Sequence, residues 1–471
     1  MVGEKLVVAC QENYQFLTGL GYDKCAQDEH VSVVQPSKAV AEFIQKLSPL
    51  DRVMAGFWTP TMYAFETPGK EMDPESLKRS LSLALDKAPT LAGLLYNLDG
   101  SKDTISSGKE YAIRCPGPGV WFAHETIQAD FQEMKKQMFN YEMLPSRHRF
   151  KRFIDAVPAY LKGGPSAPLL AIKASYFPCG SVLLLIYINH LVADGRACYE
   201  FIKLWSEISR NSTANDLFDA RHLFVPDGKI TPAALEKAKA SKPFSKAEDK
   251  FTSFRACTIT IPVSSMQSLK RKINSELEPL GEFVTTDDLF TAVVWRAITR
   301  ARQITAKTCI QRSIDVRKRL SPPNSLCNGI ICDPSCPLDA QVLTSLPLAQ
   351  VALLLRHQVQ AASHPQYLQD YLNSLAISLP SHASPQFVNF WFNNDLLVSS
   401  YAKFLPSEIN FGDAPAIQMA RAIYFEGHLV TYPAIHHQNY AVLGISQDHV
   451  HRFLKDAELL NLGFTPKLPP L

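Results

Sequence analysis

The sequence predicts an α/β fold in which mixed β-sheets carry flanking helices. Residues 181–189 form an apolar run of strand length, and from residue 194 onward apolar residues recur at the three-to-four spacing of a helix face. A second helix pattern at 285–302 and a strand pattern at 310–320 follow. Because strands and helices alternate in both halves of the chain, layers of sheet and helix are favoured over a helical bundle or a β-sandwich.

Length and composition predict a globular protein of two domains. At 471 residues, the chain exceeds what one hydrophobic core usually serves. Hydrophobic residues make up 46% and charged residues 20%, far from the composition of disordered chains. A polar stretch broken by Pro226-Asp227-Gly228 is typical of a linker. We therefore expect an N-terminal domain at 1–210, a crossover linker at 211–250 and a C-terminal domain at 251–471.

Charge and hydropathy argue against two classes of partner. The formal net charge is only +3, and no long block of Lys and Arg is interleaved with aromatic residues, so a nucleic-acid partner is not expected. The longest apolar stretch, 182–188, has the length of a strand and is far too short for a membrane span. Ten cysteines without a secretion signal indicate reduced thiols. We expect a cytoplasmic monomer.

The residues that most resemble metal ligands are spaced unfavourably for binding a metal. Cys327, Cys332 and Cys336 lack the second pair of cysteines or the spaced histidines of a zinc site. His436 and His437 are adjacent, and adjacent side chains of a strand point to opposite faces. No metal site is expected.

In the first half, a buried strand is predicted over 181–189 and ends at His190. The helix after it opens with Asp194, an acidic residue at the positive end of the helix dipole. Its apolar face is formed by Cys198, Phe201, Ile202, Trp205 and Ile208. Residues 190–195 are therefore predicted to form a loop between a strand and a helix.

In the second half, residues 285–288 (Thr-Thr-Asp-Asp) supply N-cap candidates for a helix that should pack on a sheet. The apolar face of this helix is formed by Phe290, Val293, Val294, Ala297 and Ala301. The strand predicted over 310–320 places Asp315 and Arg317 together on one face, as the period of two requires.

The segment His190-Leu191-Val192-Ala193-Asp194-Gly195 is the clearest candidate for chemistry. An imidazole with an ordinary pKa of about 6.5 accepts a proton near neutral pH, and an alcohol must lose a proton as it attacks a thioester. Asp194 is better suited to pairing with an arginine and holding the loop. The plain alternative is a hydrogen-bonded core histidine followed by a helix cap, and the spacing alone does not decide between the two.

Other segments accompany this one in a fixed order. Asp315-Val316-Arg317-Lys318-Arg319 is followed by Pro322-Pro323 and Asn328, and the preceding helix carries Trp295-Arg296. Together with His-x-x-x-Asp-Gly at 190–195, they resemble the BAHD acyltransferases, and most of all the fungal trichothecene 3-O-acetyltransferases. The resemblance spans nearly the whole chain.

The family's late motif, Asp-Phe-Gly-Trp-Gly, is matched only in part, by Asn410-Phe411-Gly412-Asp413-Ala414. In relatives this segment lies away from the reacting atoms and shapes the CoA channel and the fold. The loss of an acid at Asn410 is expected to change what Arg317 or Arg319 pairs with.

The resemblance implies two chloramphenicol-acetyltransferase-like domains with an active-site channel between them. His190 would lie in the middle of the channel as general base. Transfer from CoA to the acceptor would be direct, and no Gly-x-Ser-x-Gly nucleophile elbow is present. Asp194 would point away from the substrate and pair with Arg317, so that both residues and Gly195 support the active-site loop.

By the same analogy, two groups of residues are candidates for binding CoA. Ser264, Lys270 and Arg271 lie in the region that faces the nucleotide in relatives, although a solvated basic helix face is the common alternative. Ser399 and Ser400 are candidates for the pantetheine arm, against the alternative of plain strand residues. Acyl-CoA, in the simplest case acetyl-CoA, would be a co-substrate, and no permanently bound cofactor is expected.

The expected reaction is acyl transfer to a hydroxyl of a terpenoid, alkaloid or polyketide. One alternative is a condensation-type enzyme that forms an amide or ester from a carrier-bound acyl group. Such domains usually carry two adjacent histidines, and here Asn189 stands in the first place. Another alternative is a non-catalytic binding protein of the same fold, which the intact His190 and Asp194 disfavour.

Overall fold

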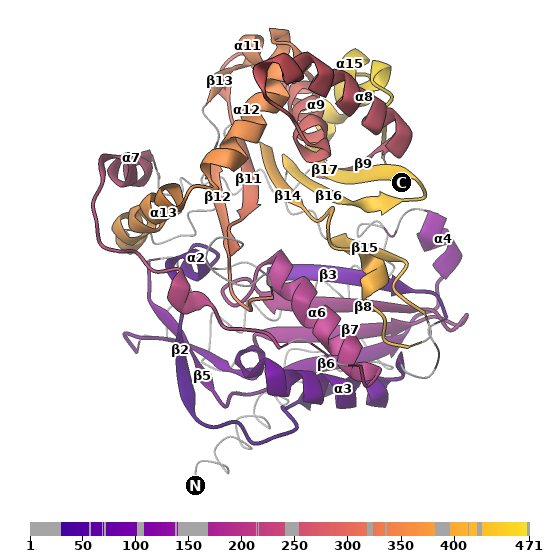
Figure 1. The fold of residues 1–471 in the computed structure, drawn as a ribbon. Helices are drawn as coiled ribbons and strands as arrows, with labels where there is room; N and C mark the ends of the chain where they lie inside the picture. The colour runs from indigo at the N-terminus through magenta and orange to yellow at the C-terminus, as the bar shows by residue number, and fades with distance from the viewer. Residues whose placement is uncertain are drawn as a thin grey trace.

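The computed structural model describes the chain with several gaps (Figure 1). The described residues are 30–55, 58–67, 69, 72–100, 108–136, 139, 168–212, 214, 216–240, 254–317, 324–334, 337–381, 396–412, 414–421 and 426–468. Two larger mixed sheets form the framework of this part of the chain, one above the other in Figure 1.

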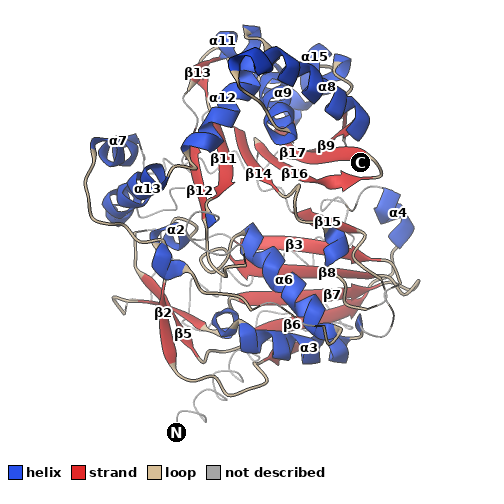
Figure 2. Ribbon diagram, viewed as in Figure 1, coloured by secondary structure: helices blue, strands red, loops and turns tan. Residues whose placement is uncertain are grey.

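The first sheet is built almost entirely from the N-terminal half. Its strand order is β1 (His30–Val34), β6 (Val120–Thr126), β7 (Leu170–Tyr176), β8 (Val182–Asn189), β3 (Trp58–Phe65) and β15 (Gln418–Arg421). Strands β6 and β7 run parallel and the other neighbours antiparallel. Every residue of β8 is buried, as its unbroken apolar run predicts. Helices α3 (Pro74–Lys87) and α6 (Gly195–Ser209) contact each other along the sheet (Figure 2).

The second sheet belongs to the C-terminal half. Its strand order is β12 (Ile330–Pro334), β11 (Ile310–Asp315), β14 (Leu396–Ser400), β16 (His428–Ile435), β17 (Gln438–Ser446), β9 (Phe254–Pro262) and β18 (Thr465–Lys467). Strands β11, β14 and β16 are parallel, and the remaining pairs are antiparallel. The accompanying helices are α8 (Val263–Leu277), α9 (Thr286–Ala301), α11 (Ala340–Ser345), α12 (Leu348–Ala361), α14 (Gln447–Leu454) and α15 (Ala457–Asn461).

Smaller elements complete the described part of the chain. The short strands are β2 (Phe43–Lys46), β4 (Leu94–Asn97), β5 (Tyr111–Cys115), β10 (Lys307–Thr308) and β13 (Leu338–Asp339). The additional α-helices are α2 (Pro49–Arg52), α4 (Phe131–Lys136), α7 (Pro232–Ala240) and α13 (Pro365–Ser378). Single 3₁₀ turns are η3 (Pro89–Ala92), η5 (Arg221–Leu223), η6 (Glu278–Leu280), η7 (Leu379–Ser381) and η9 (Pro406–Glu408).

Local signals place both predicted helices correctly. The Asp194 carboxylate caps α6 by accepting a hydrogen bond of 3.0 Å from the Ala197 backbone N–H. Thr285 caps α9 in a capping box with Asp288, in which each side chain accepts a hydrogen bond from the other residue's backbone N–H. The predicted α/β fold of mixed sheets and flanking helices is thereby confirmed.

Two local expectations need correction. The strand predicted over 310–320 ends at Asp315, so the fully buried Arg317 lies beyond the strand, although its guanidinium still pairs with the more exposed Asp315 carboxylate at 3.3 Å. The reason is that the chain turns after β11, where the Arg317 N–H donates to the Asp315 carboxylate at 3.0 Å. His436 and His437 lie in the turn between β16 and β17, both with positive φ, and not in a strand.

The division into domains at 1–210, 211–250 and 251–471 stays a prediction. The structure adds that one strand of the C-terminal segment is exchanged into the first sheet. Strand β15 belongs to the C-terminal segment but pairs with β3 of the first sheet, from Gln418 opposite Ala64 to Arg421 opposite Thr61. The exchange buries Met419 in the first core. Among the described residues, no helix combines the length and the apolar character needed to cross a bilayer.

Candidate active site

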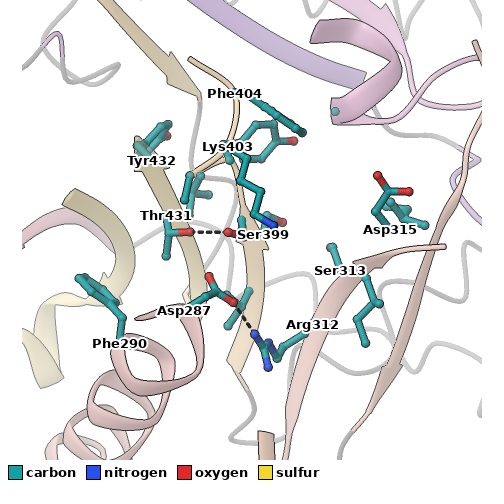
Figure 3. Close-up of a pocket in the computed structure, with 18 of the residues that line it drawn as sticks. Asp287, Phe290, Arg312, Ser313, Asp315, Ser399, Lys403, Phe404, Thr431 and Tyr432 are labelled. Atoms are coloured by element: carbon teal, nitrogen blue, oxygen red, sulfur yellow. Dashed lines mark hydrogen bonds and ion pairs between the residues drawn. The ribbon is translucent and has the colours of Figure 1, made fainter. Parts of the chain in front are cut away.

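His190 follows the last residue of β8 and faces a cavity of about 680 Å³. The cavity lies between the two halves of the chain, because its walls come from both. From the first half they include Trp58, His190, Gly195 and Arg196, and from the second half Ser399, Ser400, Tyr401, His428 and Tyr432. Figure 3 shows the cavity wall formed by β14, β16 and the start of α9, where Asp287 pairs with Arg312.

Asp194 is buried behind the cavity wall and pairs with Arg317. One guanidinium nitrogen of Arg317 donates to both carboxylate oxygens, at 2.8 and 2.9 Å. The Gly329 N–H donates to the same carboxylate at 2.9 Å, so the loop of the first half is joined to two segments of the second. A Cβ atom at Gly329 would lie 2.7 Å from the Arg317 side chain, so only glycine fits beside this pair.

Gly195 brings α6 close to the aromatic ring of Tyr401. A Cβ atom added at Gly195 would lie 2.3 Å from the Tyr401 hydroxyl oxygen, well inside any normal contact. The glycine of the His-x-x-x-Asp-Gly segment is therefore required by this close approach and not by an unusual backbone conformation.

Asn328 holds the imidazole of His190. Its side-chain N–H groups donate to the Asp51 carboxylate at 2.8 Å and to the His190 carbonyl at 2.7 Å, so its carbonyl oxygen must face the ring. This oxygen lies 3.0 Å from His190 Nδ1. An amide oxygen only accepts, which requires the proton on Nδ1 and leaves Nε2 as the free basic nitrogen.

Asp51 fixes this arrangement from behind. It is completely buried in the first turn of α2 and accepts from the backbone N–H groups of Ser48 and Asn328, at 2.8 and 3.0 Å. Its second oxygen lies 3.2 Å from Nε of the buried Arg221. Burial raises the pKa of Asp51, and the charge of Arg221 opposes that shift. Because the groups around the carboxylate are donors, Asp51 is held as an acceptor and the Asn328 amide cannot reverse.

We expect Asn328→Ala to lower kcat by roughly 10²-fold with a much smaller change in KM, because the ring loses the group that selects its tautomer. The ¹⁵N shifts of His190 should show a mixture of tautomers in the variant and a single one in the wild type. Asn324→Ala is the matched control, because the Asn324 amide donates to the Asp216 carbonyl and, among the described residues, has no hydrogen bond to His190. Wild-type kcat in Asn328→Ala would contradict the tautomer role.

The environment of His190 keeps its ring neutral. Burial is the largest cause and lowers the pKa below the ordinary 6.5, the charge of Asp194 opposes this, and the charge of Arg421 adds to it. A general base works in its neutral form, so a lowered pKa extends activity toward acidic pH. We expect the acidic limb of kcat/KM to fall below pH 6.5, measured by thiol release across a pH series. A limb well above that value would contradict the assigned environment.

Of the residues predicted to bind CoA, some line the cavity and others do not. Lys270, Ser399 and Ser400 line the cavity. Ser264 and Arg271 lie on α8 but are exposed and do not line it, and Arg271 donates to Ser268 at 3.2 Å. The cavity serines have polar neighbours of their own, since Thr431 donates to Ser400 at 3.0 Å and Ser399 lies 3.4 Å from the ring of His428.

The partial late motif lies in the core of the first half. Phe411 is buried and contacts the rings of Phe65 and Trp205 edge to face, with ring centres 5.9 and 4.5 Å away. The Asn410 side-chain oxygen accepts a hydrogen bond from the Gly412 N–H at 2.9 Å, and its backbone carbonyl accepts one from the Arg210 guanidinium. The family's acid is replaced by Asn410 in this chain, and Arg317 pairs with Asp194. Lys318, Arg319, Pro322, Pro323, Cys336 and Asp413 lie outside the described residues.

Sequence reasoning missed Asp51, Arg221 and Arg421 as parts of the site. A usable signal existed for Asp51, because Ser48 and Asp51 have the spacing of a capping box, although that pattern predicts only a helix start. Arg421 ends a four-residue strand that carries no distinctive pattern.

The comparison with protein families decides the identity. The model of the Transferase family matches residues 29–460. The chain belongs to this family, the BAHD acyltransferases. As a BAHD member it is an acyl-CoA-dependent transferase, and the resemblance seen in the motifs is confirmed.

Relatives and solved structures agree with this assignment. Putrescine hydroxycinnamoyltransferase 1 of Oryza sativa subsp. japonica is 24% identical over 439 residues, covering 85% of this chain and 91% of the relative. TRI101 of F. graminearum, solved with coenzyme A and T-2 mycotoxin, has a TM-score of 0.74 at 17% identity, covering 90% of this chain and 99% of that one. Vinorine synthase has a TM-score of 0.65 at 16% identity, covering 92% and 97%. These structural likenesses confirm the expected chloramphenicol-acetyltransferase-like BAHD fold.

Proposed function

We propose that this BAHD enzyme transfers an acyl group, in the simplest case acetyl, from acyl-CoA to a hydroxyl of a specialised metabolite, with His190 as general base. The observation that carries the proposal is that His190 lines a cavity walled by both halves of the chain, with its Nδ1 held by Asn328 and, among the described residues, no hydrogen bond to its Nε2. Asn328 orients the ring from the opposite side at 3.0 Å, which leaves the reactive nitrogen to the substrate. We further propose that the enzyme acts as a cytoplasmic monomer.

In the proposed mechanism, His190 Nε2 takes the proton of the acceptor hydroxyl while the oxygen attacks the thioester carbonyl carbon. The tetrahedral intermediate then collapses, the carbon–sulfur bond breaks, and the imidazolium returns the proton to the CoA thiolate. The products are the ester and free CoA. No acyl-enzyme forms, and each step needs only the proton that the acceptor supplies.

The supporting residues have separate roles in this proposal. Asp194 and Arg317 hold the loop against the second half of the chain, and Gly195 admits Tyr401 beside it. Lys270, Ser399 and Ser400 are the proposed contacts for the CoA side, because they line the cavity. Ser264 and Arg271 would contact only the outer, nucleotide end of CoA, because both are exposed.

The names of similar proteins suggest which donors and acceptors to try first. They include hydroxycinnamoyl-CoA donors and both amine and carboxylic-acid acceptors, and the structural neighbour was solved with a mycotoxin. The proteins with these names come from plants, so a fungal origin of this chain stays a prediction from the resemblance. An acyl group larger than acetyl and an amine acceptor both belong in the first assays.

The proposal is tested by thiol release from acetyl-CoA and p-coumaroyl-CoA with a panel of polycyclic alcohols, phenols and amines. We expect release that depends on both thioester and acceptor, with the ester or amide identified by mass spectrometry and no mass added to the protein. A burst of thiol without acceptor, together with an acylated protein, would overturn the direct mechanism. Failure of every thioester would favour the carrier-dependent or non-catalytic alternatives.

A further inference from the structure

Arg421 is a cationic group in the cavity that the proposed mechanism does not use. It ends β15 with only 8% of its surface exposed, and it lines the same cavity as His190. Its guanidinium lies over the ring of Tyr401, 4.6 Å from the ring centre. Tyr401 also packs against Gly195, so the same ring contacts both Arg421 and the active-site loop.

Within the part of the chain that the structure describes, no carboxylate lies within ion-pair distance of Arg421. Another arginine of the cavity differs in this respect, since Arg312 pairs with Asp287 and Asp288. Burying a guanidinium without a counter-charge is costly, because the group loses its hydration and no anion compensates for that loss. The planar fork of an arginine matches the two oxygens of a carboxylate, so a carboxylate is the anion that best fills this place.

Arg421 and His190 line the same cavity, and the strand register relates the elements that carry them. Arg421 is opposite Thr61 on β3, Thr61 is opposite Ile186 on β8, and β8 leads directly into His190. The charge of Arg421 also lowers the pKa of His190 and contributes to lowering that of His428 to about 3, after burial. The phosphates of CoA are separated from the thioester by the whole pantetheine arm, so the anion near His190 belongs to another part of the substrates.

We propose that Arg421 binds a carboxylate that one of the two substrates carries close to its reacting group. This inference rests on the proposed acyl transfer and names its substrate class. Two sources have the same chemistry: the acyl group of a dicarboxylic thioester such as malonyl-CoA, or a hydroxy acid as acceptor. In both cases Arg421 is a specificity-determining residue, which positions the substrate without taking part in proton transfer.

The test compares matched substrates in wild type, Arg421→Met, Arg421→Lys and the control Arg114→Met, which removes an exposed arginine on β5. Binding of malonyl-CoA against acetyl-CoA, and of 3-hydroxybenzoate against 3-hydroxybenzamide, is measured by calorimetry. Thermal melting checks that each variant is folded. If the acyl group carries the carboxylate, wild type prefers malonyl-CoA, and if the acceptor carries it, wild type prefers the acid.

We expect Arg421→Met to abolish that preference, with a loss of roughly 30-fold or more in affinity for the charged member only. Arg421→Lys should restore part of it, and Arg114→Met should leave it unchanged. Because binding is read without turnover, this result stands even if no thioester is consumed and the proposed function fails. No preference in wild type would overturn the inference. So would an equal loss of affinity for the charged and the uncharged member of a pair in Arg421→Met, since Arg421 would then support the shape of the cavity and would not recognise a carboxylate.

Discussion

His190→Ala is expected to lower kcat/KM by about 10²- to 10⁴-fold while the protein remains folded, because the acceptor hydroxyl loses its general base. His190 is only partly exposed at the cavity wall, and among the described residues its ring has a side-chain hydrogen bond with Asn328 at 3.0 Å. Removing the ring therefore disturbs little of the core. Thiol release with the best donor and acceptor pair measures the effect.

His451→Ala is the matched control, because it removes the same ring from an exposed position on α14 that does not line the cavity. Thermal melting of both variants separates a catalytic from a folding defect. Turnover at the wild-type rate in a folded His190→Ala protein would show that His190 is a structural histidine. Loss of turnover together with loss of the folded state would require the more conservative His190→Gln to be measured.

Asp194→Asn is expected to destabilise the protein by about 3–5 kcal/mol, because it leaves the fully buried Arg317 without its main counter-charge. The remaining partner, Asp315, is more exposed and lies 3.3 Å from Arg317. The measurement is the denaturant midpoint and the melting temperature, with activity assayed under conditions where the variant is still folded. Activity should fall as well, since the loop that carries His190 loses its attachment to the second half.

Removing both charges separates the two effects. Asp194→Asn combined with Arg317→Met should recover part of the lost stability, because no unpaired charge stays buried. Glu236→Gln, which breaks the exposed pair with Lys239, should change stability little. An Asp194→Asn protein as stable as wild type but without activity would contradict the structural role and indicate a direct part in chemistry.

The pairing of Asp194 with Arg317 could be anticipated from the sequence because both residues belong to recognisable segments. The same is true of α6 and α9, since a cap residue and a regular apolar spacing are local properties of the chain. The end of β11 could not be anticipated, because alternation continues past Asp315 in the sequence. The strand ends in a turn, in which the Arg317 side chain pairs with the Asp194 carboxylate of the first half of the chain.

By itself, the sequence determined the α/β class, the strand–loop–helix placement of His190 and Asp194, and the family. Only the tertiary structure decided what surrounds His190. Asn328 and Asp51 are 277 positions apart, and Asn328 is 138 positions from His190, yet the three form one hydrogen-bonded chain. The exchange of β15 likewise brings Arg421 beside a strand of the first sheet. Such contacts follow from the packing of two sheets around one cavity, and no spacing or periodicity within a single segment encodes them.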